Sequence, residues 1–89
     1  MLYMVVERFK DPKAIYARLK EKGRMQPEGL RYVDSWIQSD FEYCYQLMEC
    51  EDFDLFEQWT RNWDDLMEFD IKPVILTGEA RERMAAQET

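Results

Sequence analysis

The residues best suited to chemistry in this sequence are polar side chains on two neighbouring predicted strands. Tyr32 and Asp34 lie two apart on one strand and Gln46 lies on the next, so all three are assigned to one face of the sheet. Trp36 and Met48 add apolar walls, and such a mixture is typical of a small-ligand pocket. Asp34, half desolvated among aromatics, would suit a general base, with Tyr32 donating to a developing enolate. The structural alternative is that Asp34 caps a loop amide or pairs with an arginine across an interface with a second chain.

Other candidate side chains also have structural alternatives. Arg24, in the loop after the first predicted helix, would reach the mouth of the cleft and bind a carboxylate in a bidentate way, or form a salt bridge to one of the many acids. Glu7 and Arg8 end the first predicted strand, where one must face inward, and an internal ion pair is favoured over catalysis. Trp59 and Trp63 are assigned to the core rather than to a cofactor site.

Several chemistries lack the residues that they need. The chain contains no histidine, and its cysteines, Cys44 and Cys50, fall on one predicted strand. At about 3.3 Å per residue they lie roughly 20 Å apart, too far for a disulfide, so buried apolar packing is favoured over a reactive thiol. Neither a metal-ligand spacing, a usual haem ligand, a dinucleotide fingerprint nor a phosphate loop occurs. We therefore expect no metal and no cofactor.

Composition limits the class of protein. The chain has 89 residues, a hydrophobic fraction of 46% and a net charge of -7, which indicates one folded domain that repels nucleic acid and anionic membranes. The longest apolar run, Met1–Val6, is far shorter than the roughly 20 residues that span a bilayer, and it lacks the marks of a signal peptide. We expect a cytoplasmic protein.

Single prolines and glycines divide the chain into elements that would position these side chains. The pattern predicts strands at Leu2–Phe9, Leu30–Gln38, Tyr43–Glu51 and Phe69–Leu76, and helices at Pro12–Lys22, Phe53–Leu66 and Glu79–Thr89. The order βαββαβ is that of an α+β, ferredoxin-like domain with an antiparallel four-stranded sheet, strand order 4-1-3-2, and two helices on one face. We place this domain at residues 1–77 and a helical tail at 78–89.

The two faces of the sheet differ in what covers them. We assign four apolar residues to the helix side: Val33, Ile37, Tyr45 and Leu47. The open face, away from the helices, then carries Tyr32, Trp36, Cys44 and Met48. Such a patch is larger than monomers usually expose, and a two-fold partner presenting the same face would cover it. We therefore predict a homodimer; the alternative cover is the C-terminal tail.

Five segments together resemble a family of short, mostly bacterial uncharacterised proteins: MVVERF, GRMQPEGL, RYVDSW, CYQLMEC and DLMEFDIKPV. The resemblance covers about Met1–Val74. Such proteins are domains of unknown function and are similar to the dimeric α+β barrel superfamily, in which two ferredoxin-like sheets face each other. The resemblance implies a barrel but no single activity, because that superfamily includes cofactor-independent monooxygenases, isomerases, haem-binding enzymes and ligand binders.

Two main functions follow as hypotheses. The first is a homodimer that binds a small aromatic or acidic metabolite between the sheet and its partner, through Arg24, Tyr32, Asp34, Trp36, Gln46 and Met48. The second is a cofactor-independent monooxygenase or isomerase that abstracts a proton next to a carbonyl, with Asp34 as base. A purely structural subunit is a third possibility, so the sequence leaves open whether the protein is an enzyme.

Overall fold

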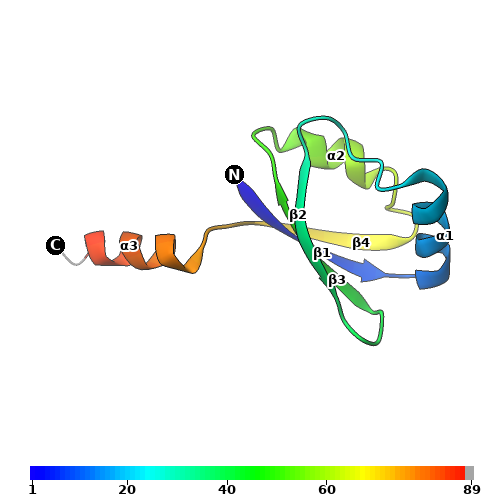
Figure 1. Ribbon diagram of the computed structural model, residues 1–89, viewed down its shortest axis with the longest axis horizontal. Coiled ribbons are helices and arrows are strands. Elements are labelled where there is room, and N and C mark those ends of the chain that lie inside the picture. Colours follow the sequence, from blue (N-terminus) through cyan, green and yellow to red (C-terminus); the bar gives the residue numbers. More distant parts are fainter. Residues whose placement is uncertain (88–89) are drawn as a thin grey trace.

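Four antiparallel strands form one sheet, in the order β2-β3-β1-β4. The computed structural model describes residues 1–87, which form β1 (Leu2–Phe9), α1 (Pro12–Lys22), β2 (Arg31–Ile37), β3 (Tyr43–Glu49), α2 (Asp54–Thr60), β4 (Met67–Val74) and α3 (Thr77–Gln87). Figure 1 shows α3 extending away from the body that the other elements form. The α+β class and the predicted strand order are confirmed. The end of the predicted tail helix, residues 88 and 89, lies outside the described residues.

Local signals in the sequence set the ends of the helices. The side chain of Asp11 accepts a hydrogen bond of 3.1 Å from the amide of Ala14, Pro12 opens α1, and Gly23 ends it with φ 69°. α2 is shorter than predicted. It ends at Thr60, and a series of turns replaces its last two turns of helix before β4 begins at Met67.

The core lies between the sheet and these two helices. Its buried members are Tyr3, Val5, Ile15, Leu30, Met48, Cys50, Phe56, Trp59, Trp63 and Met67. Phe56 packs edge-on against Tyr3, with ring centroids 5.1 Å apart, which ties α2 to β1. The prediction that Trp59 and Trp63 belong to the core is confirmed, since both are buried.

The predicted faces of β3 are wrong. Cys44 and Met48 are buried on the helix side, whereas Tyr45 and Leu47 lie on the open face. The pairing with β1 decides this, because Val5, which is fully buried under the helices, lies opposite Gln46. A one-residue change of register would move every side chain of β3 to the other face.

A β-bulge at Val33 explains why the predicted faces of the β2 residues are only partly correct. Tyr32 pairs with Met48 and Asp34 with Leu47, so Val33 is an extra residue between two pairs. The bulge shifts the alternation, and Tyr32, Ser35 and Ile37 all face the helix side. The predictions for Ile37 and Trp36 are therefore confirmed, whereas that for Tyr32 is wrong, because a regular alternation was assumed. Val33 is the bulged residue and is exposed.

α3 buries none of its described residues and does not fold across the open face. The alternative in which the tail covers that face is therefore not found in this structure. Within residues 1–87, no helix combines the length and the apolar character that a membrane crossing requires.

Candidate functional site

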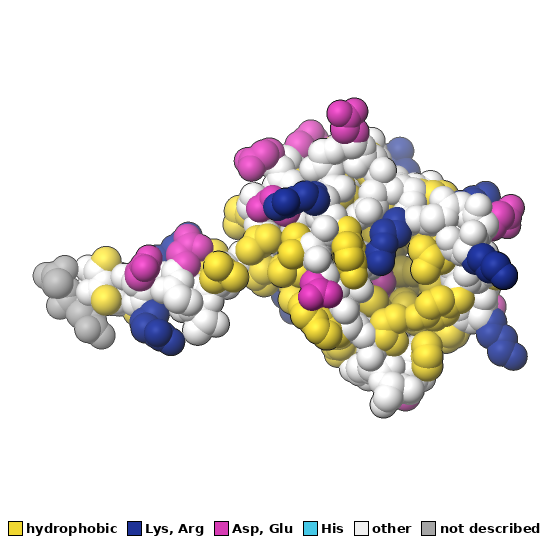
Figure 2. Space-filling model, viewed as in Figure 1, with side chains coloured by type: hydrophobic (Ala, Val, Ile, Leu, Met, Phe, Trp, Pro, Cys, Tyr) yellow, Lys and Arg dark blue, Asp and Glu magenta, His cyan; other side chains and the backbone are white. Residues whose placement is uncertain are grey.

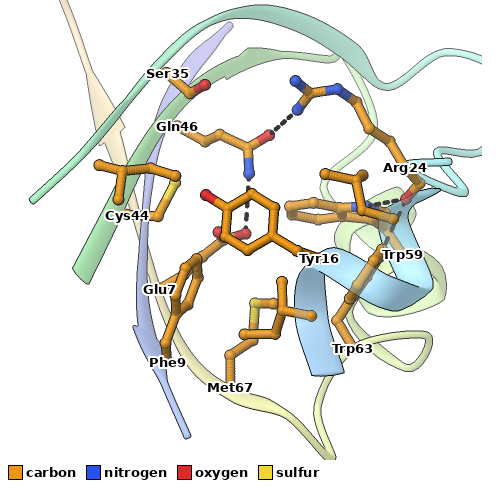
Figure 3. A pocket seen from close by; sticks show the side chains of 13 residues that line it. Glu7, Phe9, Tyr16, Arg24, Ser35, Cys44, Gln46, Trp59, Trp63 and Met67 are labelled. Atoms are coloured by element: carbon orange, nitrogen blue, oxygen red, sulfur yellow. Dashed lines mark hydrogen bonds between the residues drawn. The ribbon is translucent and has the colours of Figure 1, made fainter. Parts of the chain in front are cut away.

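A cavity of about 180 Å³ lies between the helix side of the sheet and the segment formed by α1 and its following loop. On the face seen in Figure 2, hydrophobic side chains surround a hollow between β2 and α1. Figure 3 shows the residues that line the cavity, and most of its wall is apolar or aromatic. The apolar and aromatic members include Phe9, Ile15, Leu19, Ile37, Trp59, Trp63 and Met67.

Three side chains form a hydrogen-bonded polar row along one wall of this cavity: Arg24, Gln46 and Glu7. Arg24 Nη1 donates to Gln46 Oε1 over 3.1 Å, and Gln46 Nε2 donates to Glu7 Oε2 over 3.0 Å. Gln46 and Glu7 are buried, at 6% and 4% exposure, whereas Arg24 is exposed. The polar row therefore runs from solvent to a carboxyl group inside the fold.

The backbone and the side chain of Arg24 are both held in place. Its carbonyl oxygen accepts hydrogen bonds from Nε1 of Trp59, at 3.0 Å, and of Trp63, at 3.1 Å. Its guanidinium carbon lies 3.8 Å from the centre of the Tyr32 ring, and the Tyr32 hydroxyl is hydrogen-bonded to Ser35 Oγ at 2.7 Å. Core tryptophans thus position the loop that brings this cation to the cavity.

Burial dominates the electrostatics at the inner end of the row. Desolvation raises the pKa of Glu7 from 4.5 to about 7, although hydrogen bonds from Cys44 and Gln46 and the charge of Arg24 act to lower it. Burial and the neighbouring Glu7 raise the pKa of the Cys44 thiol to about 12. Burial, with the charges of Cys44 and Glu7, also raises the pKa of Tyr16. Glu7 is therefore the group here that changes charge near neutral pH.

Comparison with known proteins places the chain in a family. The model of a domain of unknown function, DUF3303, matches residues 1–88. The chain belongs to this family. No curated protein and no solved structure matches it. The predicted membership of an uncharacterised family is confirmed, and any activity of this DUF3303 chain has to be argued from its own residues.

The structure brings together three of the six predicted site residues of this DUF3303 chain. Arg24 and Gln46 line the cavity, and the Tyr32 ring lies against Arg24. Both cysteines are free and buried, as predicted. Within residues 1–87, no cluster of three or more histidine, cysteine or acidic side chains is arranged to hold a metal ion.

The other three predicted residues lie elsewhere. Asp34 is exposed, and its carboxylate accepts a hydrogen bond of 2.8 Å from the amide of Ser35, the next residue of β2. Trp36 is 53% exposed on the open face, and Met48 is fully buried in the core. None of the three lines the cavity described above. A ligand role for these residues stays a prediction.

Sequence reasoning missed Glu7 as a site residue of the DUF3303 chain. We predicted an internal ion pair for Glu7 and Arg8, but Arg8 points to the open face and pairs with Glu68 at 3.5 Å. Glu7 instead bonds to a neutral amide. The signal was the alternation of β1, in which Glu7 follows Tyr3 and Val5 on the helix side. Ser35 was missed because the bulge moved it to that side.

Proposed function

We propose that this protein binds a small organic molecule in the cavity between the sheet and α1, as one subunit of a homodimer. The single observation that carries the proposal is the polar row of Arg24, Gln46 and Glu7 along one wall of an otherwise apolar and aromatic cavity. Ligand pockets combine an apolar lining with a few polar groups that fix the orientation of the ligand. This cavity has that composition.

The volume and the charges favour a compound with one or two rings. The cavity of about 180 Å³ is smaller than the pockets of about 300–1,000 Å³ that hold drug-sized molecules. The aromatic side chains of Phe9, Trp59 and Trp63 suit a planar ring. Arg24 at the exposed end favours a carbonyl or an acidic group there, whereas Glu7 at the buried end disfavours a second anion.

The homodimer is proposed from the composition of the open face. It carries half-buried apolar and aromatic residues from β1, β3 and β4, together with the exposed Trp36 of β2: Leu2, Met4, Val6, Tyr43, Tyr45, Leu47 and Val74. A contiguous apolar surface of this kind marks an interaction site. A second copy of the chain, with ferredoxin-like sheets facing each other about a two-fold axis, is the occupant that we propose.

Charge supports a second copy as the occupant. The chain carries a net charge of -7, but the strand residues of the open face include three cations and four anions. The cations are already paired within the chain, as Arg8 with Glu68, Arg31 with Glu49 and Lys72 with Asp70. Two such faces can therefore meet with little net repulsion, although the whole chains repel each other.

Binding is tested by tryptophan fluorescence in a Trp36→Phe background, in which the remaining tryptophans, Trp59 and Trp63, both line the cavity. Titration with 2-indanone, an aromatic ketone of suitable size, should change their emission saturably. Ser35→Phe, which fills the cavity, should abolish the change. Ser39→Phe, the same substitution at an exposed turn position, should retain it. Absence of a saturable change, or equal binding by the Ser35→Phe variant, overturns the proposal.

The homodimer is tested independently by sedimentation equilibrium of the unmodified chain at micromolar concentration. We expect a mass of two chains. A monomer at these concentrations removes the homodimer from the proposal but leaves the cavity, because all of the residues that line it belong to one chain.

A further inference from the structure

We infer that Glu7 is a proton-transfer group and that the cavity accepts a neutral, enolisable ketone, from which Glu7 removes a hydrogen next to the carbonyl. This inference rests on the proposed function, since it requires a cavity that admits such a molecule. It adds a reaction class and a substrate class to a binding site, and it assigns the base to a different strand from the one predicted.

The burial of the Glu7 carboxyl group lowers the stability of the fold. This cost indicates that the carboxyl group has a functional role. It lies on the helix side of the central strand β1, 4% exposed, and it borders the cavity. Burial of a carboxyl group is unfavourable, and an apolar residue of similar volume is often the more stable choice. The neighbouring cation Arg8 does not explain the burial, because it pairs with Glu68 on the open face.

Among the titratable groups that face each other around Glu7, Glu7 itself is the one suited to act as a base. β3 contributes Cys44 and Gln46, the loop after α1 contributes Arg24, and α1 contributes Tyr16. On the β4 side of β1, Phe69 is the residue paired with Glu7, and it carries no charge. Cys44 and Tyr16 are protonated at neutral pH, because the pKa values of a thiol and a phenol ordinarily lie above it and burial raises both further. A carboxyl with a pKa of about 7 suits proton transfer at neutral pH.

The opposite end of the polar row supplies donors for the carbonyl oxygen. Arg24 uses Nη1 to reach Gln46, and its guanidinium has further N–H groups on the same plane. Ser35 lies directly across from Gln46 in the strand pairing, and it also lines the cavity. One amide side chain separates Arg24 from Glu7, so a ketone can place its oxygen at Arg24 and Ser35 and its α carbon toward Glu7.

The reaction is a proton transfer that needs no other reactant. The Glu7 carboxylate takes a proton from the α carbon, the C–H electron pair forms the C=C bond, and the carbonyl π pair moves to the oxygen. Arg24 and Ser35 stabilise the resulting enolate. The neutral Glu7 then has two outcomes. If its proton is first replaced by one from solvent, its return to the same carbon gives exchange, and delivery of a proton to the far end of a conjugated system gives an isomer.

The experiment measures hydrogen exchange of 2-indanone in D₂O by proton NMR, at pD values from 6 to 8. We expect the whole protein to accelerate the loss of the α-hydrogen signal well beyond an equal concentration of acetate. Glu7→Gln should slow this catalysed exchange by about 100-fold or more, since general bases contribute about 10²–10⁴-fold. Tryptophan emission should show that Glu7→Gln still binds the ketone. Indane, which has the same rings but lacks the carbonyl, serves as a binding control.

The outcomes separate the inference from the proposed function. Saturable binding of 2-indanone without accelerated exchange overturns the inference and leaves the binding site in place. Absence of binding overturns both. Exchange that persists in the Glu7→Gln variant removes Glu7 as the base. As a second measurement, the side-chain carboxyl of ¹³C-labelled Glu7 should titrate near neutral pH, and a normal carboxyl titration contradicts the inference without reference to any ketone.

Discussion

Each face of the sheet departs in its own way from the composition that an isolated domain favours. The helix side of the central strands carries a carboxyl, an amide and a thiol, from Glu7, Gln46 and Cys44, all buried. The open face of the same strands carries aliphatic and aromatic side chains, such as Val6, Tyr45 and Leu47, with only partial cover. One face thus holds polar groups that it does not need for packing, and the other holds apolar surface that it does not bury.

This difference indicates two separate uses of one sheet. Buried polar groups that break the local packing pattern lower the stability of a fold. They are therefore found mainly at functional sites. Apolar residues left on an open face concentrate at interfaces. The proposed division gives chemistry to the helix side and association to the open face, and the following experiments test it.

The largest expected effect is on the helix side. Trp59→Ala removes a buried ring that contacts Phe56 and Phe69 and donates to the Arg24 carbonyl. It should lower the free energy of unfolding by about 3–5 kcal/mol, and the loss should be similar at every protein concentration. Urea denaturation followed by circular dichroism measures it. A loss that disappears at high protein concentration contradicts the assignment of Trp59 to the core.

The next effect is the pH dependence that Glu7 confers. Its pKa rises from 4.5 to about 7 on folding, so the folded state binds the proton more tightly than the unfolded chain. The free energy of unfolding should therefore fall by about 3 kcal/mol as pH rises from 4.5 to about 7, and Glu7 should add no further change above that. Comparing Glu7→Gln with the unmodified chain at each pH isolates this contribution. Parallel curves for the two chains contradict the prediction.

On the open face, Trp36→Ala should weaken dimerisation rather than folding. Trp36 is 53% exposed in the single chain, and a large aromatic at an interface contributes about 2 kcal/mol or more, or roughly 30-fold in the dimer constant. Sedimentation equilibrium measures the constant. Phe41→Ala, at an exposed aromatic in the β2–β3 turn, is the control and should leave it unchanged. If Trp36→Ala unfolds the chain and leaves the dimer constant unchanged, the assignment of Trp36 to the open face is contradicted.

The smallest expected effect is on α3. A chain that ends at Leu76 should keep its stability within about 0.5 kcal/mol, because α3 has no buried residue. It should also bind 2-indanone like the full chain, since no α3 residue lines the cavity. Thermal denaturation and the fluorescence titration measure the two quantities. A weaker dimer with unchanged folding would add α3 to the interface and sharpen the division between the two faces.

Much of the fold could be predicted because local signals specify it. Asp11 and Pro12 begin α1, Gly23 ends it, and alternating apolar residues mark the strands, so the element order and the strand order follow. The family could also be predicted from short segments. Two of the three residues of the polar row, Arg24 and Gln46, could be predicted as well.

The tertiary structure alone decided which face each strand presents. Alternation divides the residues of a strand into two sets, but only pairing across the sheet shows which set meets the helices. The pairing of Val5 with Gln46 turned polar groups inward, and the bulge at Val33 brought Tyr32 and Ser35 to the same side. Because neither long-range register nor a bulge has a reliable local signal, the sequence determined the elements, and the packed sheet determined the site.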